Sequence, residues 1–198
     1  MTVSETRWKV LKGREVLVGV TGGIAAYKTA MLVSRLVEAG AGVSVVMTEH
    51  ATRFVAPLTF QTLSGRPVGV DLYEPPEGFM PEHVALADLA EVAVVAPATA
   101  NLLGKLAHGI ADDLLTTVLL ALDAPVVAAP AMNVRMWAHP AVQANVEALR
   151  ERGVHLVGPE EGRLACGVKG KGRMAEPEAI LEAIAAVLSK RPRRKGKG

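Results

Sequence analysis

Apolar runs alternate with amphipathic stretches along most of the chain. Short runs that are apolar throughout predict buried strands, and apolar residues at helical spacing predict the helices between them. The strands are expected at 15–20, 42–47, 92–96, 125–129 and 154–157, and the helices at 24–39, 51–63, 102–122, 139–152 and 177–188. This alternation predicts an α/β fold: a single-domain, doubly wound parallel sheet, Rossmann-like or flavodoxin-like, with helices on both faces.

Two stretches do not fit this alternation. Residues 67–81 are rich in proline and glycine, which predicts a surface loop. Residues 159–177 contain Gly162, Gly167, Gly170 and Gly172 and show no periodicity, so we expect a second long loop there. A loop of that length inside a compact domain is more often functional than idle.

The composition fits one packed domain. Half of the 198 residues are apolar and 21% are charged, which excludes an intrinsically disordered chain. The net charge of +2 hides a basic end, because residues 190–198 hold six basic residues and leave 16 basic against 20 acidic residues, a charge of −4, in the rest. We predict a domain over 1–189 and a basic disordered tail over 190–198. The tail could touch a polyanion such as nucleic acid, but a solvated end is the favoured interpretation.

Several classes of protein are excluded by what the sequence lacks. Uncharged stretches such as 92–104 fall short of the roughly 20 residues that a membrane helix needs, and the amino terminus has no apolar core of the secretory type. One cysteine excludes a disulfide framework, and no cluster has the spacing of metal ligands. We therefore expect a cytoplasmic protein without a metal and without a membrane contact.

The first predicted strand ends in a glycine turn. Gly22 and Gly23 would let backbone N–H groups approach an anion, and the helix that follows would offer its positive end. The turn is neither Gly-x-Gly-x-x-Gly nor a Walker A sequence, so it does not indicate NAD or ATP. A tight turn without a ligand is the alternative.

Two later strands end alike. One runs into Ala-Pro-Ala-Thr-Ala-Asn at 96–101 and the other into Ala-Pro-Ala-Met-Asn at 129–133. Ligands of open α/β sheets lie beyond the carboxyl ends of the strands. Small side chains there leave room for a flat ring, and the amides of Asn101 and Asn133 suit a heterocycle or a carboxylate. A proline that ends the strand and an asparagine that caps a helix are the alternative.

Two single residues are candidates for chemistry. His83 precedes a buried strand, whereas His50, His108, His139 and His155 are expected on helix surfaces or loops. Cys166 lies among glycines and cations, where its thiol would be accessible and its pKa lowered. An inert, buried cysteine is the alternative.

Together these segments resemble the family of homo-oligomeric flavin-containing cysteine decarboxylases. The matching segments span 21–28, 57–65, 96–101 with 109–114, 130–137 and 164–174. Pro-Ala-Met-Asn-Val-Arg-Met-Trp at 130–137 and Ala-Cys-Gly at 165–167 are the specific ones. The resemblance implies FMN as the cofactor, no metal, and a homo-oligomer built on trimers, as a trimer or a dodecamer.

The resemblance also assigns roles to residues. It implies FMN contacts from the glycine turn and from the polar strand ends, namely Gly22, Gly23, Ile24, Ala25, Thr48, Thr99, Ala100, Asn101 and Met132. It implies catalysis by His83, by Asn133 as the holder of the substrate carboxylate, and by Cys166 on a substrate-clamping loop. Lys28, Met136 and Ala165 are expected on the substrate side. The family pattern has an arginine where this chain has Asp88.

The activity implied is decarboxylation of 4′-phosphopantothenoylcysteine to 4′-phosphopantetheine in coenzyme A biosynthesis. FMN would oxidise the substrate to a thioaldehyde, CO₂ would leave to give an enethiol, and Cys166 would supply a proton during reduction. Alternatives are a peptide-cysteine decarboxylase, a flavin prenyltransferase, and a non-catalytic flavin-binding regulatory subunit. Many bacterial relatives carry a second domain that ligates cysteine to phosphopantothenate, and we expect only the decarboxylase half here.

Overall fold

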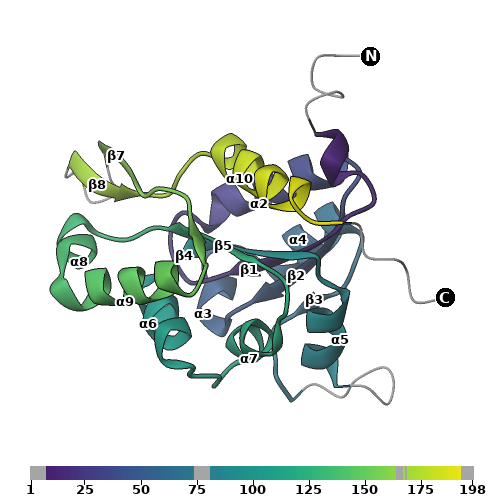
Figure 1. Ribbon diagram of the computed structural model, residues 1–198, viewed down its shortest axis with the longest axis horizontal. Coiled ribbons are helices and arrows are strands. Elements are labelled where there is room, and N and C mark those ends of the chain that lie inside the picture. The colour runs from purple at the N-terminus through teal and green to yellow at the C-terminus, as the bar shows by residue number, and fades with distance from the viewer. Residues whose placement is uncertain (1–7, 74–80, 164–166, 168, 193–198) are drawn as a thin grey trace.

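A six-stranded parallel sheet forms the centre of the computed structural model, which describes residues 8–73, 81–163, 167 and 169–192. The strand order is β3-β2-β1-β4-β5-β6, the order of a Rossmann sheet. The strands are β1 (Glu15–Val20), β2 (Gly42–Met47), β3 (Val68–Gly69), β4 (Val92–Ala98), β5 (Val126–Pro130) and β6 (His155–Leu156). The predicted fold class is confirmed (Figure 1).

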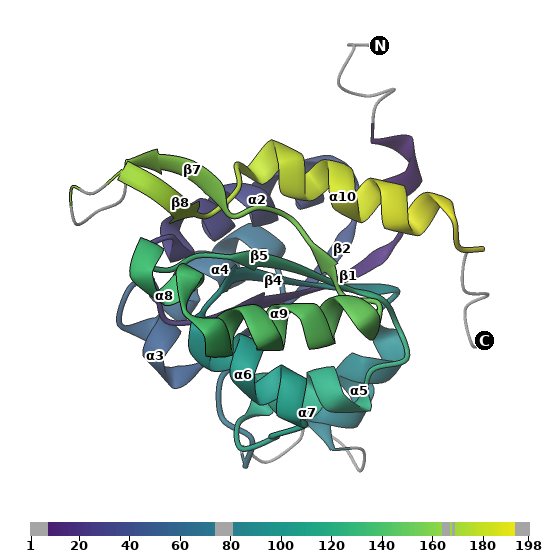
Figure 2. The same ribbon diagram turned by 60° about the vertical axis from the view of Figure 1, so that its left-hand side comes forward.

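Helices cover both faces of the sheet (Figure 2). One face carries α2 (Ala26–Glu38), α4 (Pro57–Ser64) and α10 (Pro177–Ser189), and the other carries α5 (Glu82–Leu89), α6 (Ala100–His108), α7 (Leu114–Ala121) and α9 (Pro140–Glu151). Shorter helical segments are η1 (Lys9–Leu11), α3 (Glu49–Thr52) and α8 (Val134–Ala138). Over the described ranges, no helix is long and apolar enough to cross a membrane.

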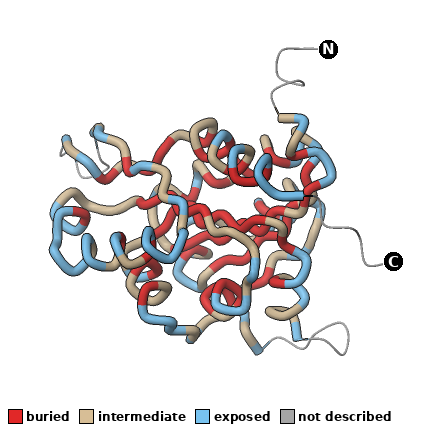
Figure 3. Tube along the Cα trace, viewed as in Figure 1, coloured by how far each residue is buried: buried red, intermediate tan, exposed pale blue. Residues whose placement is uncertain are grey.

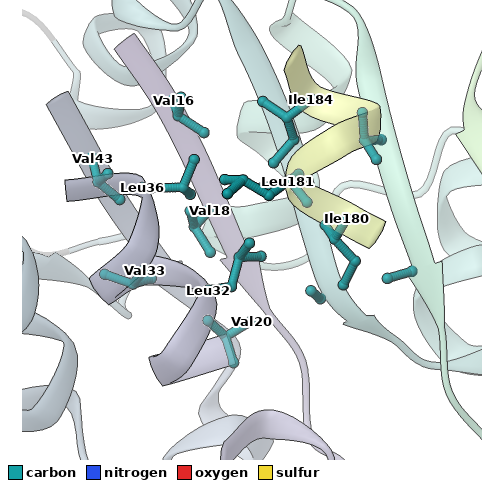
Figure 4. Packing of buried hydrophobic residues seen from close by; sticks show 14 of the residues in the cluster. Val16, Val18, Val20, Leu32, Val33, Leu36, Val43, Ile180, Leu181 and Ile184 are labelled. Atoms are coloured by element: carbon teal, nitrogen blue, oxygen red, sulfur yellow. The ribbon is translucent and has the colours of Figure 1, made fainter. Parts of the chain in front are cut away.

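Strand β1 shows how the apolar runs become the core. Val16, Val18 and Val20 point to one face and pack with residues of α2 and α10, as Figure 4 shows. Leu17 points to the opposite face, where α7 lies so close that a Cβ at Gly19 would be 2.6 Å from Leu115 Cδ1. The central strands are therefore buried from both sides (Figure 3), which explains why they are apolar throughout.

Two predicted helices are each divided in the structure. The helix expected at 102–122 is α6 and α7, because Gly109 adopts a left-handed conformation (φ 67°) that ends α6 and Asp113 starts α7 with a capping box. The helix expected at 51–63 is α3 and α4, because Pro57 lies in the first turn of α4, where its missing N–H costs no hydrogen bond.

The two predicted loops also contain regular structure. Residues 67–81 include β3, the edge strand beside β2. His83 lies just beyond them in α5, a helix that was not predicted from the sequence. Residues 159–177 include an antiparallel hairpin of β7 (Glu160–Arg163) and β8 (Lys169–Arg173). The basic tail predicted at 190–198 lies largely outside the described residues.

The capping box of α7 is expected to stabilise the fold. The Asp113 carboxylate accepts hydrogen bonds from the backbone and hydroxyl of Thr116, both at 2.8 Å, and from Lys105 Nζ at 3.1 Å. Burial raises the pKa of Asp113, but these hydrogen bonds outweigh burial and lower it overall. Asp113→Ala should reduce the free energy of unfolding by about 1 kcal/mol at pH 7 in urea titrations.

The pH dependence separates this cap from a general surface effect. Because the folded pKa of Asp113 is lowered, the contribution of its carboxylate is present above the unfolded pKa of about 3.9 and is lost as the pH falls through the folded value. The difference between wild type and Asp113→Ala should therefore shrink at acidic pH. Asp112→Ala is the control, since this carboxylate is 58% exposed and pairs with the same lysine. Equal losses in both variants would contradict the capping role.

Candidate functional site

The strand order creates a crevice between the carboxyl ends of β1 and β4. The chain winds from β1 toward β2 and β3 on one side and from β4 toward β5 and β6 on the other. The two connections therefore diverge at this point, where open α/β sheets bind their ligands. The glycine turn follows β1 and Thr99 follows β4, so the structure brings these two predicted segments together.

The hydroxyl group of Thr21 joins the two segments. It is buried, donates a hydrogen bond to the Pro97 carbonyl at 2.6 Å, and lies 3.3 Å from Thr99 Oγ1. It also accepts a hydrogen bond from the backbone N–H of Thr99 at 3.3 Å. The sequence alone predicts no role for Thr21, because its contacts depend on how the two turns are placed in the fold.

Close packing determines the shape of the glycine turn. A Cβ at Gly22 would lie 2.5 Å from His50 Cβ and 3.0 Å from the His50 carbonyl carbon, so α3 leaves no room for a side chain. At Gly23 the nearest atom to a Cβ would be 3.7 Å away, an ordinary contact. Thr48 caps α3 by accepting the Ala51 N–H at 3.3 Å.

The start of α2 fits an anionic group. The N-cap residue, Ala25, provides no side-chain hydrogen bond, so the positive end of this helix has no side-chain cap. Ile24 is 62% exposed beside it. Across the crevice, the Thr99 hydroxyl caps α6, with Ala100 and Asn101 in the first turn of that helix. Together these residues offer backbone donors next to an apolar surface, which suits a phosphorylated flat ring.

The third predicted segment follows β5 and lies beneath the hairpin. Met132 donates its backbone N–H to the Gly172 carbonyl of β8 at 3.0 Å. Asn133 caps α8 because its side-chain oxygen accepts the Arg135 N–H at 2.8 Å, which orients the amide. The nitrogen of that amide is the end able to donate to a carboxylate. Met136 is 48% exposed in the same helix.

Other predicted residues lie elsewhere. The Lys28 ammonium forms an ion pair with Glu176 at 2.9 Å and is largely buried. His83 lies on α5, next to the edge strand β3. The preceding residue, Glu82, shows how close this helix is to the strand, because its Oε1 would be 3.0 Å from a Cβ built on Gly69. Asp88 is exposed on the same helix. Cys166 and Ala165 fall outside the described residues.

His83 and Asn133 of one chain lie toward opposite edges of the sheet. Strands β2, β1 and β4 separate β3, beside which α5 begins, from β5, which leads to Asn133. Four strand spacings of about 4.8 Å make this a separation of roughly 19 Å. Figure 1 shows the same arrangement, with α5 and α8 at opposite ends of the molecule.

Within the described chain, no three His, Cys, Asp or Glu side chains are grouped to hold a metal ion.

A family model described as "Flavoprotein" matches residues 5–189. The chain therefore belongs to the Flavoprotein family. Among curated proteins, it is 54% identical over 173 residues to the coenzyme A biosynthesis bifunctional protein CoaBC of Bacillus subtilis (strain 168), a match that covers 87% of this chain and 43% of the relative. The chain thus spans less than half the length of the curated relatives it matches.

Two solved flavoprotein structures are similar along nearly their whole length. The FMN-dependent cysteine decarboxylase SpaF has a TM-score of 0.80 and 36% identity, covering 91% of this chain and 98% of its own. A cysteine-to-serine mutant of a PPC decarboxylase, complexed with pantothenoylaminoethenethiol, has a TM-score of 0.79 and 33% identity, covering 88% and 98%. The assignment to the flavin-containing cysteine decarboxylases is confirmed.

The packing at the glycine turn leads to a testable difference between its two glycines. Gly22→Ala should lower the free energy of unfolding of the flavin-free protein by about 1–3 kcal/mol, because the new methyl group meets backbone atoms of His50 that cannot easily move. Gly23→Ala is the matched control and should leave stability nearly unchanged. Thermal and urea unfolding measure both. Equal stability of the two variants would show that His50 yields at no cost.

Proposed function

We propose that the chain catalyses the FMN-dependent decarboxylation of 4′-phosphopantothenoylcysteine to 4′-phosphopantetheine, a step of coenzyme A biosynthesis. The observation that carries this proposal is the match to a solved PPC decarboxylase over 98% of that chain's length. The name of the coenzyme A biosynthesis relatives supports the same pathway. The glycine turn, the Thr99 turn and the Asn133 segment all lie at the carboxyl ends of the strands, and this arrangement supports one shared site.

FMN fits the crevice that these segments form. Its phosphate would bind the backbone N–H groups at Gly22, Gly23, Ile24 and Ala25, at the uncapped start of α2. Thr48, Thr99, Ala100, Asn101 and Met132 would surround the rest of the cofactor. When bound, FMN accepts two electrons from the substrate and returns them after CO₂ has left.

The protein's own residues then bind the substrate and move protons. The Asn133 amide donates to the substrate carboxylate and orients the C–C bond that breaks, so that its electron pair enters the adjacent C=S group. His83 takes the proton of the substrate thiol as the thioaldehyde forms. After CO₂ leaves, Cys166 donates the proton that converts the enethiol into the saturated thiol. The overall reaction is redox neutral and releases one CO₂.

The strand order supports action of His83 from a second copy of the chain, because β3, beside which α5 begins, is separated from β5 by four strand spacings, roughly 19 Å. We propose a homo-oligomer built on trimers in which α5 of one subunit completes the site of the next. Exposed apolar side chains support this assembly: Ile24 precedes α2, Tyr27 and Met31 lie in it, Phe54 follows α3, and Leu58 lies in α4. Contiguous exposed apolar surface is typical of protein interfaces.

The function is tested by incubating the protein with phosphopantothenoylcysteine and, separately, with a peptide that ends in cysteine. Mass spectrometry should detect 4′-phosphopantetheine, and the peptide should remain unchanged. Cys166→Ser should still release CO₂ but should accumulate the enethiol, lighter than the normal product by two hydrogen atoms, with the flavin bleached by reduction. Decarboxylation of the peptide alone would overturn the substrate assignment. Normal product at the normal rate from Cys166→Ser would remove that thiol from the mechanism.

Subunit complementation tests the shared site. His83→Asn and Asn133→Ser should each be inactive alone, and serine at 133 keeps an oxygen for the cap of α8. Equal amounts of the two chains, refolded together, should recover about one quarter of wild-type activity, because one quarter of randomly formed boundaries pair an intact Asn133 with an intact His83. A mixture that stays inactive, with mixed oligomers confirmed by native mass spectrometry, would place both residues in one subunit's site.

A further inference from the structure

The hairpin has two different faces. Its register pairs Gly162 with Gly170, and pairs Arg163 with Lys169 and Glu161 with Lys171. Opposed residues of an antiparallel pair share a face, so along these three pairs one face is glycine and the other is charged, while the fourth pair, Glu160 and Arg173, lies at the base of the hairpin. Exposure agrees, since Gly172 is buried and Gly162 and Gly170 are half-buried, whereas the charged residues of these pairs are exposed. The glycine face is therefore the one turned toward the protein.

That glycine face lies directly on the segment that carries Asn133. Besides the hydrogen bond from Met132 to the Gly172 carbonyl, a Cβ at Gly170 would be only 2.7 Å from Val134 Cγ1. In the described part of the chain, β7 and β8 pair only with each other and not with the six-stranded sheet. The position of the hairpin therefore depends on these contacts with the Met132–Val134 segment and on the contacts at its base.

Four charged residues of alternating sign lie at that base. Glu160 begins β7, Arg173 ends β8, Glu176 is the N-cap residue of α10, and Lys28 lies in the first turn of α2. Arg173 Nη2 lies 2.8 Å from Glu160 Oε2 and 3.3 Å from Glu176 Oε1, and Lys28 Nζ lies 2.9 Å from that same Oε1. The chain of ion pairs links the hairpin to the helix that follows the glycine turn.

Arg173 is the central member of this chain. It contacts both carboxylates, and its Nε is buried without an acceptor among the described residues, 3.2 Å from where a Cβ of Gly162 would be. The hydrogen bond to Glu160 raises the pKa of Arg173, and the hydrogen bond from Lys28 lowers the pKa of Glu176. Because residue 162 is a glycine, no side chain lies between the backbone of β7 and the Arg173 guanidinium.

We infer that Arg173 is a positioning residue that holds the β7–β8 hairpin on the Met132–Val134 segment. It contacts neither of the predicted catalytic residues described here, Asn133 and His83, and acts by fixing the backbone beside Asn133. Each ion pair is partly exposed and weak by itself. Removing Arg173 breaks two of the pairs at once, so its loss should free the hairpin while leaving the sheet intact.

Hydrogen exchange of the holoenzyme tests this inference without an activity assay. In Arg173→Gln, the Met132 amide should exchange about fivefold faster than in the wild type, because its acceptor is on the hairpin. The Ala131 amide, which donates to the Ala98 carbonyl inside the sheet, should keep its rate. Arg163→Gln removes the same charged group from the exposed face and should change neither rate. Arg173→Lys should restore part of the protection.

Gly162→Ala provides a second variant if Arg173→Gln does not fold, since the new methyl group would lie 3.2 Å from Arg173 Nε and would push this side chain out of its present position by a few tenths of an ångström. Unchanged Met132 exchange in a folded variant, or an equal effect in Arg163→Gln, would overturn the inference.

The activity measurement rests on the proposed function. In Arg173→Gln, kcat for phosphopantothenoylcysteine should fall about fivefold with FMN affinity unchanged, and Arg173→Lys should recover most of it. A wild type that does not turn over this substrate would refute the proposed function and leave the exchange result as the test of Arg173.

Discussion

The hydrogen bonds of one buried hydroxyl group connect the two halves of the sheet at the point where they diverge. Thr21 follows β1 and bonds to Pro97 and Thr99, which end β4 and begin α6. A parallel sheet that is wound in both directions leaves a crevice at this point, and its two sides belong to different connections of the chain. The Thr21 bonds fix the spacing between those sides, so the glycine turn and the Thr99 turn face a ligand as one unit.

A second constraint is the close approach of neighbouring segments to the backbone at three glycines. Helix α3 lies against Gly22, α7 lies against Gly19, and the hairpin lies on Val134 at Gly170. In each place a methyl group would collide with its neighbour, so these glycines are required by packing. Glycine therefore allows close packing in strand β1 at Gly19, in the turn after it at Gly22, and in the hairpin at Gly170.

The distribution of charge follows from this arrangement. Lys28 neutralises Glu176 at the base of the hairpin. Where the hairpin lies on the Asn133 segment, its inner face consists of glycine, and the charged pair of Glu160 and Arg173 lies at the base, while Glu161, Arg163, Lys169 and Lys171 are exposed on the outer face. Charge is thus excluded from the contact between the hairpin and the Asn133 segment, where an unpaired ion would be costly. The chain of ion pairs at the base takes over the anchoring that apolar side chains provide elsewhere in the fold.

The sequence by itself determined the fold class and indicated the segments of the proposed site. Strands β1 and β2 begin and end where the sequence predicts, because strands buried on both faces are apolar at most positions. The Met-Asn-x-x-Met-Trp and Ala-Cys-Gly segments are local in sequence and could be recognised there. Only the tertiary structure decided that Thr21 joins two turns, that α5 places His83 beside the far edge strand, and that Lys28 pairs with Glu176. These contacts join residues 76 to 148 positions apart or depend on strand order, and periodicity along a chain carries no information about such pairs.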